Sequence, residues 1–176
     1  MLNLDDKRWL DLNAAYGPAK NIPDLIASLE NFPDSKNYKD EPYFSLWSSL
    51  CHQGDIYTAS YASFPHLIEL CKTSPDKAKL SAIQLAVSID MARLSNPKSP
   101  ALPLDLSDDY FKAKQELLGV VVVMMQRNPS EELAVIVMQA TALNVDNAKW
   151  AAAIAEFNPE IASDFLEKFW DGEFNA

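Results

Sequence analysis

The fold of this chain depends most on residues 44–71, which read FSLWSSLCHQGDIYTASYASFPHLIELC. Both cysteines and both histidines of the chain fall in this stretch. Apolar side chains recur at three- and four-residue steps on either side of Gly54, which predicts two helices with one apolar face each. Gly54 is expected to end the first helix in a left-handed conformation, and Asp55 to cap the second. The stretch therefore predicts a helical hairpin whose inner faces need neighbours.

Length and composition predict one helical domain over residues 1–176. A chain of 176 residues is long enough to bury about 70% of the surface that it exposes when unfolded. Hydrophobic residues make up 48% of the chain, which is enough for a core. Only 4 glycines occur against 11 prolines, a composition that disfavours a sheet-rich fold with many tight turns. We therefore expect an all-α fold.

Helical periodicity extends over nearly the whole chain and predicts nine helices. The clearest start signals are Asn21, with Pro23 in the first turn, and Ser130 directly after Pro129. The run GVVVVMM at residues 119–125 is apolar on every side and is compatible with a strand, but the uninterrupted length around it favours a helix. The nine predicted helices are residues 5–16, 21–32, 44–54, 55–71, 74–94, 107–127, 130–143, 146–157 and 159–170.

Two proline-led segments suggest an internal repeat. Residues 22–29 (IPDLIASL) and 64–71 (FPHLIELC) share the order of apolar residue, proline, any residue and two apolar residues. Pro23 and Pro65 lie 42 positions apart, within the period of HEAT and armadillo repeats. A weaker third copy begins at Pro159. The repeat predicts a short α-solenoid of antiparallel helices, with a generic helical bundle as the alternative.

The charge of the chain favours a basic partner over nucleic acid. The formal net charge is −10, from 15 Lys and Arg against 25 Asp and Glu. Such a chain repels phosphate backbones, and no basic cluster free of interleaved acids occurs in it. An acidic surface attracts a basic protein and speeds its capture. The alternative is that the acidity only keeps the protein soluble.

Cellular location is predicted from the cysteines and from the apolar runs. The two cysteines fall on predicted apolar faces, which suits reduced, buried thiols better than a disulfide. The sequence begins MLNLDD, without the basic and apolar regions of a signal peptide. The longest apolar run, residues 120–125, is too short to cross a bilayer. We expect a cytoplasmic protein without membrane contact.

Four side chains of the central stretch are of types that bind metal ions. Cys51, His52, His66 and Cys71 have suitable ligand atoms. Adjacent residues such as Cys51 and His52 point about 100° apart on a helix, however, and no pair has the spacing of a zinc motif. We therefore expect no metal site.

Catalysis also finds little support, and we expect neither an enzyme nor a cofactor. Ser48, His52 and Asp55 have helical spacing for a triad, but N–H groups within a helix are not available as an oxyanion hole. The paired acids at 40–41, 108–109 and 131–132 fit helix starts, where a carboxylate stabilises the helix dipole. No glycine-rich phosphate loop is present.

The polar faces around Gly54 are the remaining candidate for a site. One interpretation is a solvated face, with His52 and Gln53 holding the turn by backbone hydrogen bonds. The other is a recognition surface of the kind that helical-repeat proteins present to partners. The partner-binding residues predicted on that basis are His52, Gln53, Asp55, Tyr57, Tyr61 and His66, followed by the acids Asp105, Asp108 and Asp109.

Part of the sequence resembles a known group of proteins. Residues 46–67 (LWSSLCHQGDIYTASYASFPHL), with the lead-in YGPA at 16–19 and Ile22-Pro23, are similar to small bacterial HEAT-like proteins. The resemblance covers about residues 9–71 and fades afterwards. It implies a helical-repeat fold, and some such proteins are immunity partners of secreted antibacterial toxins.

The leading hypothesis combines this resemblance with the charge. It is an acidic binding protein, most concretely an immunity protein that blocks a basic toxin domain, with a nuclease as the expected class. The competing hypothesis is a DNA-repair or modification enzyme on a HEAT-like scaffold, which needs a basic groove with aromatic residues. A third is a scaffold for another cytosolic complex.

Overall fold

The computed structural model describes residues 1–156 and 159–170, and that part of the chain is mostly helical. Two short 3₁₀ helices, η1 (Lys7–Asp11) and η2 (Leu29–Asn31), and two small β-hairpins complete the fold. Within the described residues there are eight α-helices: α1 (Ile22–Ser28), α2 (Tyr43–Leu50), α3 (Thr58–Thr73), α4 (Leu80–Ser95), α5 (Leu104–Arg127), α6 (Glu131–Asn144), α7 (Ala148–Glu156) and α8 (Pro159–Trp170). Each corresponds to a predicted helix.

The first predicted helix, residues 5–16, is wrong. The chain forms η1 and then a β-hairpin of β1 (Asn13–Ala14) and β2 (Gly17–Pro18). Helical spacing would put Trp9 and Tyr16 on one side of such a helix, but Trp9 is buried whereas Tyr16 is 72% exposed. Gly17 has φ +118°, a conformation that a residue with a side chain rarely adopts, so the strand pairing closes at this glycine.

A second hairpin replaces the predicted helix corner at Gly54. Gly54 is left-handed as predicted, with φ +83°, but α2 has already ended at Leu50. Gln53 (φ +51°) and Gly54 form the two-residue turn between β3 (Cys51–His52) and β4 (Asp55–Ile56). Positive φ at both turn residues matches the twist of a tight hairpin. Asp55 therefore lies in a strand and does not cap α3, whose N-cap residue is Tyr57.

Other start and stop signals give a mixed outcome. The Ser130 hydroxyl accepts from the Leu133 backbone N–H at 3.2 Å, which confirms the predicted cap of α6. The apolar run at residues 119–125 is helical, within α5. The helix predicted from residue 74 begins only at Leu80. Phe157, the last residue predicted for the eighth helix, lies outside the described residues.

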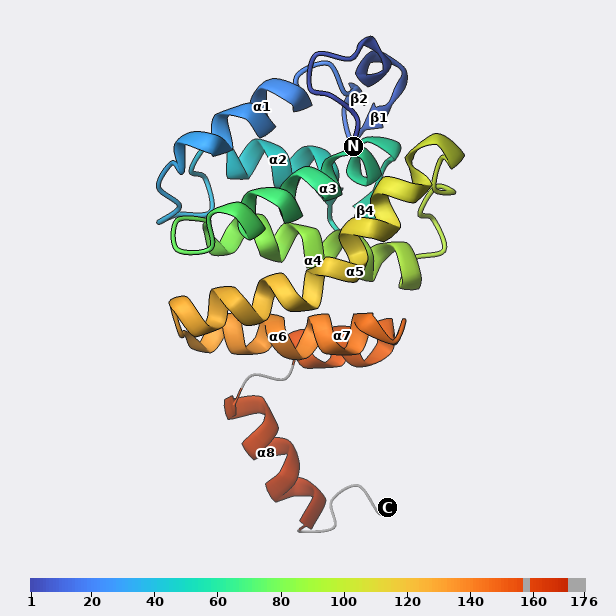
Figure 1. Ribbon diagram of the computed structural model, residues 1–176. Helices are drawn as coiled ribbons and strands as arrows, with labels where there is room; N and C mark the ends of the chain where they lie inside the picture. Colours follow the sequence, from blue (N-terminus) through green and yellow to red (C-terminus); the bar gives the residue numbers. More distant parts are fainter. Residues whose placement is uncertain (157–158, 171–176) are drawn as a thin grey trace.

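Helices two apart in the chain pack against each other, but the proline repeat is not structural. Figure 1 shows α1 near the top of this stack and α6 and α7 at its lower end, with α3 beside α5, α5 beside α6 and α6 beside α7. Pro23 lies in the first turn of α1, whereas Pro65 lies in the interior of α3. Because the two prolines occupy different helical positions, the 42-residue pattern does not mark equivalent units.

The core contains aromatic rings and one ionic cluster. Tyr110 of α5 lies against Tyr61 and Phe64 of α3, with ring centroids 5.4 and 4.5 Å away. Its hydroxyl donates to Asp90 Oδ1 at 2.7 Å, and Arg93 Nε donates to the same oxygen at 2.8 Å. Asp90 is fully buried. A carboxylate is thus the polar centre where α4 and α5 meet.

None of the described helices is both long and apolar enough to cross a membrane.

Candidate functional site

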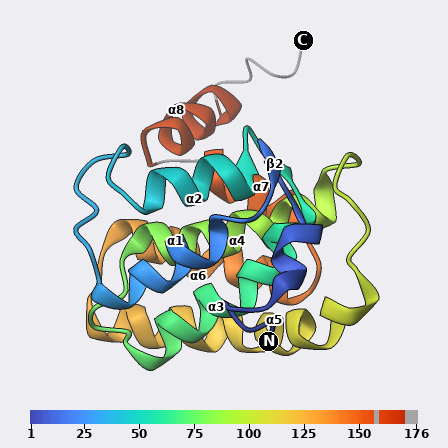
Figure 2. The ribbon, with the colours of Figure 1, turned by 90° about the horizontal axis from the view of Figure 1, so that it is seen from above.

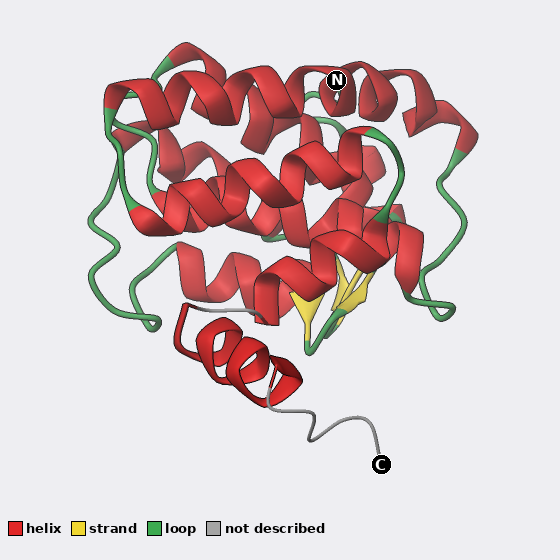
Figure 3. Ribbon diagram, turned by 90° about the horizontal axis from the view of Figure 1, so that it is seen from below, coloured by secondary structure: helices red, strands yellow, loops and turns green. Residues whose placement is uncertain are grey.

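The two β-hairpins meet although they are far apart in sequence. The first hairpin is held by two backbone donors, Asn13 N–H to Thr58 Oγ1 at 2.8 Å and Ala15 N–H to Ser49 O at 2.9 Å. Figure 2 shows β2 beside α2, and Figure 3 shows the strands gathered in one place. The Tyr16 hydroxyl and His52 Nδ1 share a hydrogen bond of 3.2 Å, and the two rings meet edge to face with centroids 5.5 Å apart.

A groove of about 480 Å³ opens between the hairpins, α2 and the loop before it. Its mouth carries Tyr16 and Tyr38, which are 72% and 78% exposed, and Phe44, which is 41% exposed. The Tyr38 and Phe44 rings meet edge to face with centroids 6.5 Å apart. Trp47 Nε1 donates to Ser81 O at 3.2 Å and thereby holds the indole in the wall. The full lining is Tyr16, Asn37, Tyr38, Tyr43, Phe44, Trp47, Ser48, Cys51, His52, Gln53, Ser81 and Gln84.

This aromatic groove is neutral and poorly suited to covalent chemistry. Its lining includes no Asp, Glu, Lys or Arg. Burial raises the pKa of the Cys51 thiol to about 11, and that of the Tyr43 hydroxyl to about 12, so both stay protonated at neutral pH. An uncharged groove with π-faces and hydrogen-bonding groups is suited to recognition.

The side chains of the considered triad bond elsewhere. Ser48 donates its hydroxyl proton to Ser45 O at 3.2 Å, and His52 Nδ1 bonds Tyr16. The Asp55 carboxylate accepts from Asn96 Nδ2 at 2.8 Å. Within the described residues, no group of three or more His, Cys, Asp or Glu side chains is placed to hold a metal ion.

The predicted partner-binding residues separate into several places. His52 and Gln53 line the aromatic groove. Asp55 pairs with His52 across the second hairpin, and Tyr57 directly precedes α3. Tyr61 is a core residue with 1% exposure, and its hydroxyl donates to Pro100 O at 2.6 Å. A folded chain cannot present Tyr61 to a partner.

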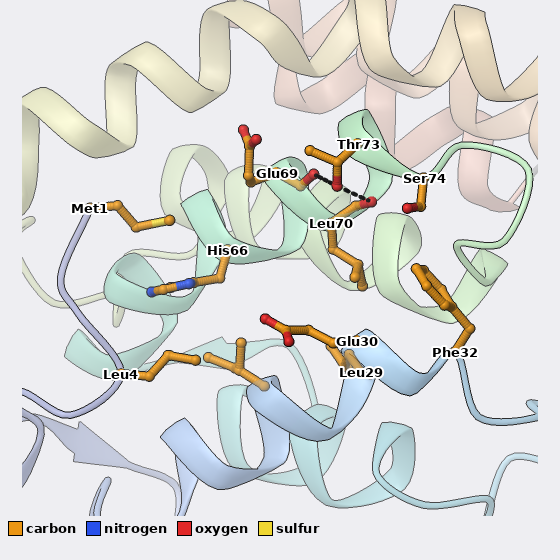
Figure 4. A pocket seen from close by; sticks show the side chains of 11 residues that line it. Met1, Leu4, Leu29, Glu30, Phe32, His66, Glu69, Leu70, Thr73 and Ser74 are labelled. Carbon is orange, nitrogen blue, oxygen red and sulfur yellow. Dashed lines mark hydrogen bonds between the residues drawn. The ribbon is translucent and has the colours of Figure 1, made fainter.

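His66 lines a different pocket, of about 350 Å³, formed by the N-terminal segment, α1, η2 and α3. Figure 4 shows its ring pointing toward Met1 and Leu4, with the Glu30 carboxylate between the two sides. Nε2 lies 2.8 Å from Leu2 O, and because a carbonyl only accepts, Nε2 carries the proton. His66 thus anchors the N-terminal segment.

The predicted acids lie on α5, and none of them lines the aromatic groove. Asp105 forms an ion pair with Arg8 at 3.2 Å, and Asp109 with the Met1 amine at 2.5 Å. Asp108 is exposed. Two of the three carboxylates therefore bind groups of the chain itself, and the structure does not bring them to the predicted hairpin residues.

Sequence reasoning missed Tyr16 and Tyr38 as site residues. Tyr16 falls within the predicted helix of residues 5–16, and its contact with His52 spans 36 positions of the chain. Tyr38 stands in the polar loop of residues 33–42, where an aromatic side chain has no local reason to occur. An isolated aromatic residue in a polar loop was the one available signal.

The pocket around His66 leads to a prediction for stability. Burial lowers the pKa of His66, so the unfolded chain takes up this proton at higher pH than the folded chain does. Stability contributed by neutral His66 is complete above the ordinary value of about 6.5 and is lost as the pH falls through and below it. We expect His66→Gln to lose less stability than the wild type between about pH 7.5 and about pH 5.5, measured by urea denaturation.

The control for this prediction is Thr73→Ala, which changes the same pocket without removing a titratable group. It should keep the wild-type pH dependence. An identical pH dependence in His66→Gln and the wild type would show that the histidine titrates equally in both states.

Comparison with known proteins assigns this chain to no family. The arrangement of the groove and the charge of the chain therefore carry the functional argument. The resemblance of residues 9–71 to small bacterial HEAT-like proteins stays a prediction. No protein-family model matches the chain, and neither a curated protein nor a solved structure matches it.

Proposed function

We propose that this chain is a binding protein that captures a basic protein partner through the aromatic groove. Most concretely, it is an immunity protein that binds and blocks a basic antibacterial toxin domain, with a nuclease as its class. The observation that carries the proposal is the pair of edge-to-face contacts at the groove, Tyr16 with His52 and Tyr38 with Phe44. Exposed, fixed aromatic rings around a groove are typical of protein interfaces.

The charge supports a basic partner. A net charge of −10 attracts a cationic domain over several ångströms and raises its association rate. The groove itself carries no formal charge, so docking there desolvates no buried ion of this chain. Long-range attraction and short-range packing are thus supplied by different parts of the surface.

The proposal includes the architecture. We infer a short α-solenoid, because helices two apart in the chain pack on one another, α1 on α3, α3 on α5, α2 on α4 and α4 on α6 (Figure 1). In such a stack each helix pair buries its apolar face against the next and leaves an extended side for binding. We place the protein in the cytoplasm, where the two free cysteines stay reduced.

The test is a binding titration with the purified protein encoded by the neighbouring gene. We expect a complex by calorimetry whose affinity falls at least about tenfold as the salt rises from about 0.05 to 0.5 M, because salt screens the attraction between opposite charges. The complex should also suppress the activity of the partner. An affinity that does not change with salt concentration would contradict the proposed electrostatic attraction. Absence of binding would contradict the proposed partner.

A further inference from the structure

We propose that the aromatic groove receives an arginine side chain from an extended basic segment of the partner, stacked on the tyrosine rings at the groove mouth. This inference rests on the proposed function and names the chemical group that the groove recognises. It follows from the ring faces, from the charges around them and from the acceptors in the lining.

The tyrosine rings are exposed yet held in place. Tyr16 is 72% and Tyr38 78% exposed, so a large part of each ring is open to a ligand. Each is oriented by a second ring, His52 for Tyr16 and Phe44 for Tyr38. A binding surface that is already ordered loses little conformational entropy when a ligand docks.

The charges around these rings favour a cation. The face of a tyrosine ring is electrically negative and attracts cations within about 6 Å of its centroid. Lys39 Nζ of the chain itself lies over the Tyr38 ring, 5.4 Å from its centroid, so that side of the ring already carries a cation and an arginine would stack on the other side. The lining residues themselves include no Lys or Arg, and the net charge of −10 attracts a cation to the protein.

The lining favours a guanidinium over an ammonium group. A compact, strongly hydrated ammonium needs a carboxylate to replace its water, and the groove lining has none. A guanidinium is planar and weakly hydrated, stacks on aromatic rings and presents five N–H donors. The side-chain amide oxygens of Asn37, Gln53 and Gln84 are acceptors around the same groove.

The experiment compares short capped peptides of arginine, lysine or citrulline by calorimetry with the full chain at physiological ionic strength. Arginine and lysine peptides carry equal charge, so their difference reports on stacking rather than on net attraction. We expect the arginine peptide to bind about 3- to 10-fold more tightly than the lysine peptide, and the neutral citrulline peptide to bind weakest. The double variant Tyr16→Leu, Tyr38→Leu should remove the arginine preference.

Two control variants test the location. Trp150→Leu removes an aromatic side chain of α7 that is 64% exposed and lies outside the groove, so the arginine preference should persist. Glu30→Gln removes a carboxylate of the His66 pocket and should also leave the preference intact. Equal affinity for arginine and lysine peptides, or a preference that survives the double tyrosine variant, would overturn the inference. Loss of the preference in Glu30→Gln would do the same.

Binding of the neighbouring gene product to the wild type and to the double tyrosine variant distinguishes failure of this inference from failure of the proposed function. If the neighbouring gene product binds and the double tyrosine variant weakens it about 10- to 100-fold, both are supported. If it binds with unchanged affinity in the double variant, the arginine site is overturned and the binding function stands. An arginine preference without binding of that product supports the groove assignment and overturns the proposed partner.

Discussion

Asp90→Ala is expected to lower the free energy of unfolding by about 3–5 kcal/mol, because the substitution removes one member of a buried ionic cluster. Asp90 is fully buried, while the Arg93 and Lys114 side chains are only 16% and 13% exposed. Arg93 Nε lies 2.8 Å from Asp90 Oδ1, and Lys114 Nζ lies 3.8 Å from Oδ2. Without the carboxylate, both cations stay away from water with less negative charge beside them.

Asp146 does not compensate for this loss. Its carboxylate contacts Lys114 and lies 3.8 Å from Arg93 Nη2, but its side chain is 66% exposed, so water screens its charge. Within the described residues, Asp90 Oδ2 and Arg93 Nη2 are buried without a hydrogen-bond partner. The cluster therefore has no additional hydrogen bonds that could replace those lost with the Asp90 carboxylate. The Asp90 carboxylate is therefore the central acceptor of the polar contact between α4 and α5.

Urea denaturation of Asp90→Ala, Asp90→Asn and the wild type measures this dependence. Asp90→Asn keeps an acceptor for the Tyr110 hydroxyl and for Arg93 but loses the charge, so its effect should lie between the other two. Asp34→Ala is the control, because it removes an exposed partner of Lys36 and should change stability little. Equal stability of Asp90→Ala and Asp34→Ala would show that the buried cluster contributes nothing net.

Tyr61→Ala is expected to cost about 3–5 kcal/mol of stability and to leave partner affinity per folded molecule unchanged. Tyr61 is 1% exposed and contacts the Tyr110 ring, so alanine leaves a cavity between α3 and α5. Tyr61→Phe keeps the ring and removes only the hydroxyl that donates to Pro100 O, a loss of about 1–2 kcal/mol.

Thermal and urea denaturation measure the first part, and calorimetry with the neighbouring gene product under strongly native conditions measures the second. Tyr57→Ala serves as the comparison, because Tyr57 is only partly buried and its loss should destabilise less. A stable Tyr61→Ala protein that no longer binds would contradict the core assignment and restore Tyr61 as an interface residue.

The sequence predicted most helices because their signals are local. Pro23 in a first turn and the Ser130 hydroxyl on the Leu133 N–H act within four residues. The long apolar run in α5 was likewise assigned correctly, since no turn signal interrupts it. Amphipathic period and capping chemistry need no knowledge of the rest of the fold.

The hairpin of residues 13–18 was missed because its support is distant. Ala15 donates to Ser49 O, and Asn13 donates to Thr58 Oγ1, across 45 positions of the chain. A helical pattern in residues 5–16 was therefore outweighed by bonds that only the folded chain offers. The turn at Gly54 was found as a left-handed glycine, but whether such a glycine ends a helix or closes a hairpin depends on its partner strand.

The residues of the candidate site were likewise predicted only in part. Residue types around Gly54 sufficed to select His52 and Gln53, which line the aromatic groove, but the same reasoning also selected Tyr61, a core residue, and His66, which lines another pocket. Helix α3 is buried on nearly every side, so spacing along it could not tell a surface residue from a core residue.

By itself, the sequence determined the helical class, the positions of eight helices and the acidic charge, because these follow from composition and from contacts within a few residues. Only the tertiary structure decided that Tyr16 meets His52, that Tyr38 meets Phe44 and that Tyr61 lies in the core. The physical reason is that a groove is made of side chains from separate segments, and their packing is set by which apolar faces find each other, a choice that no local pattern records.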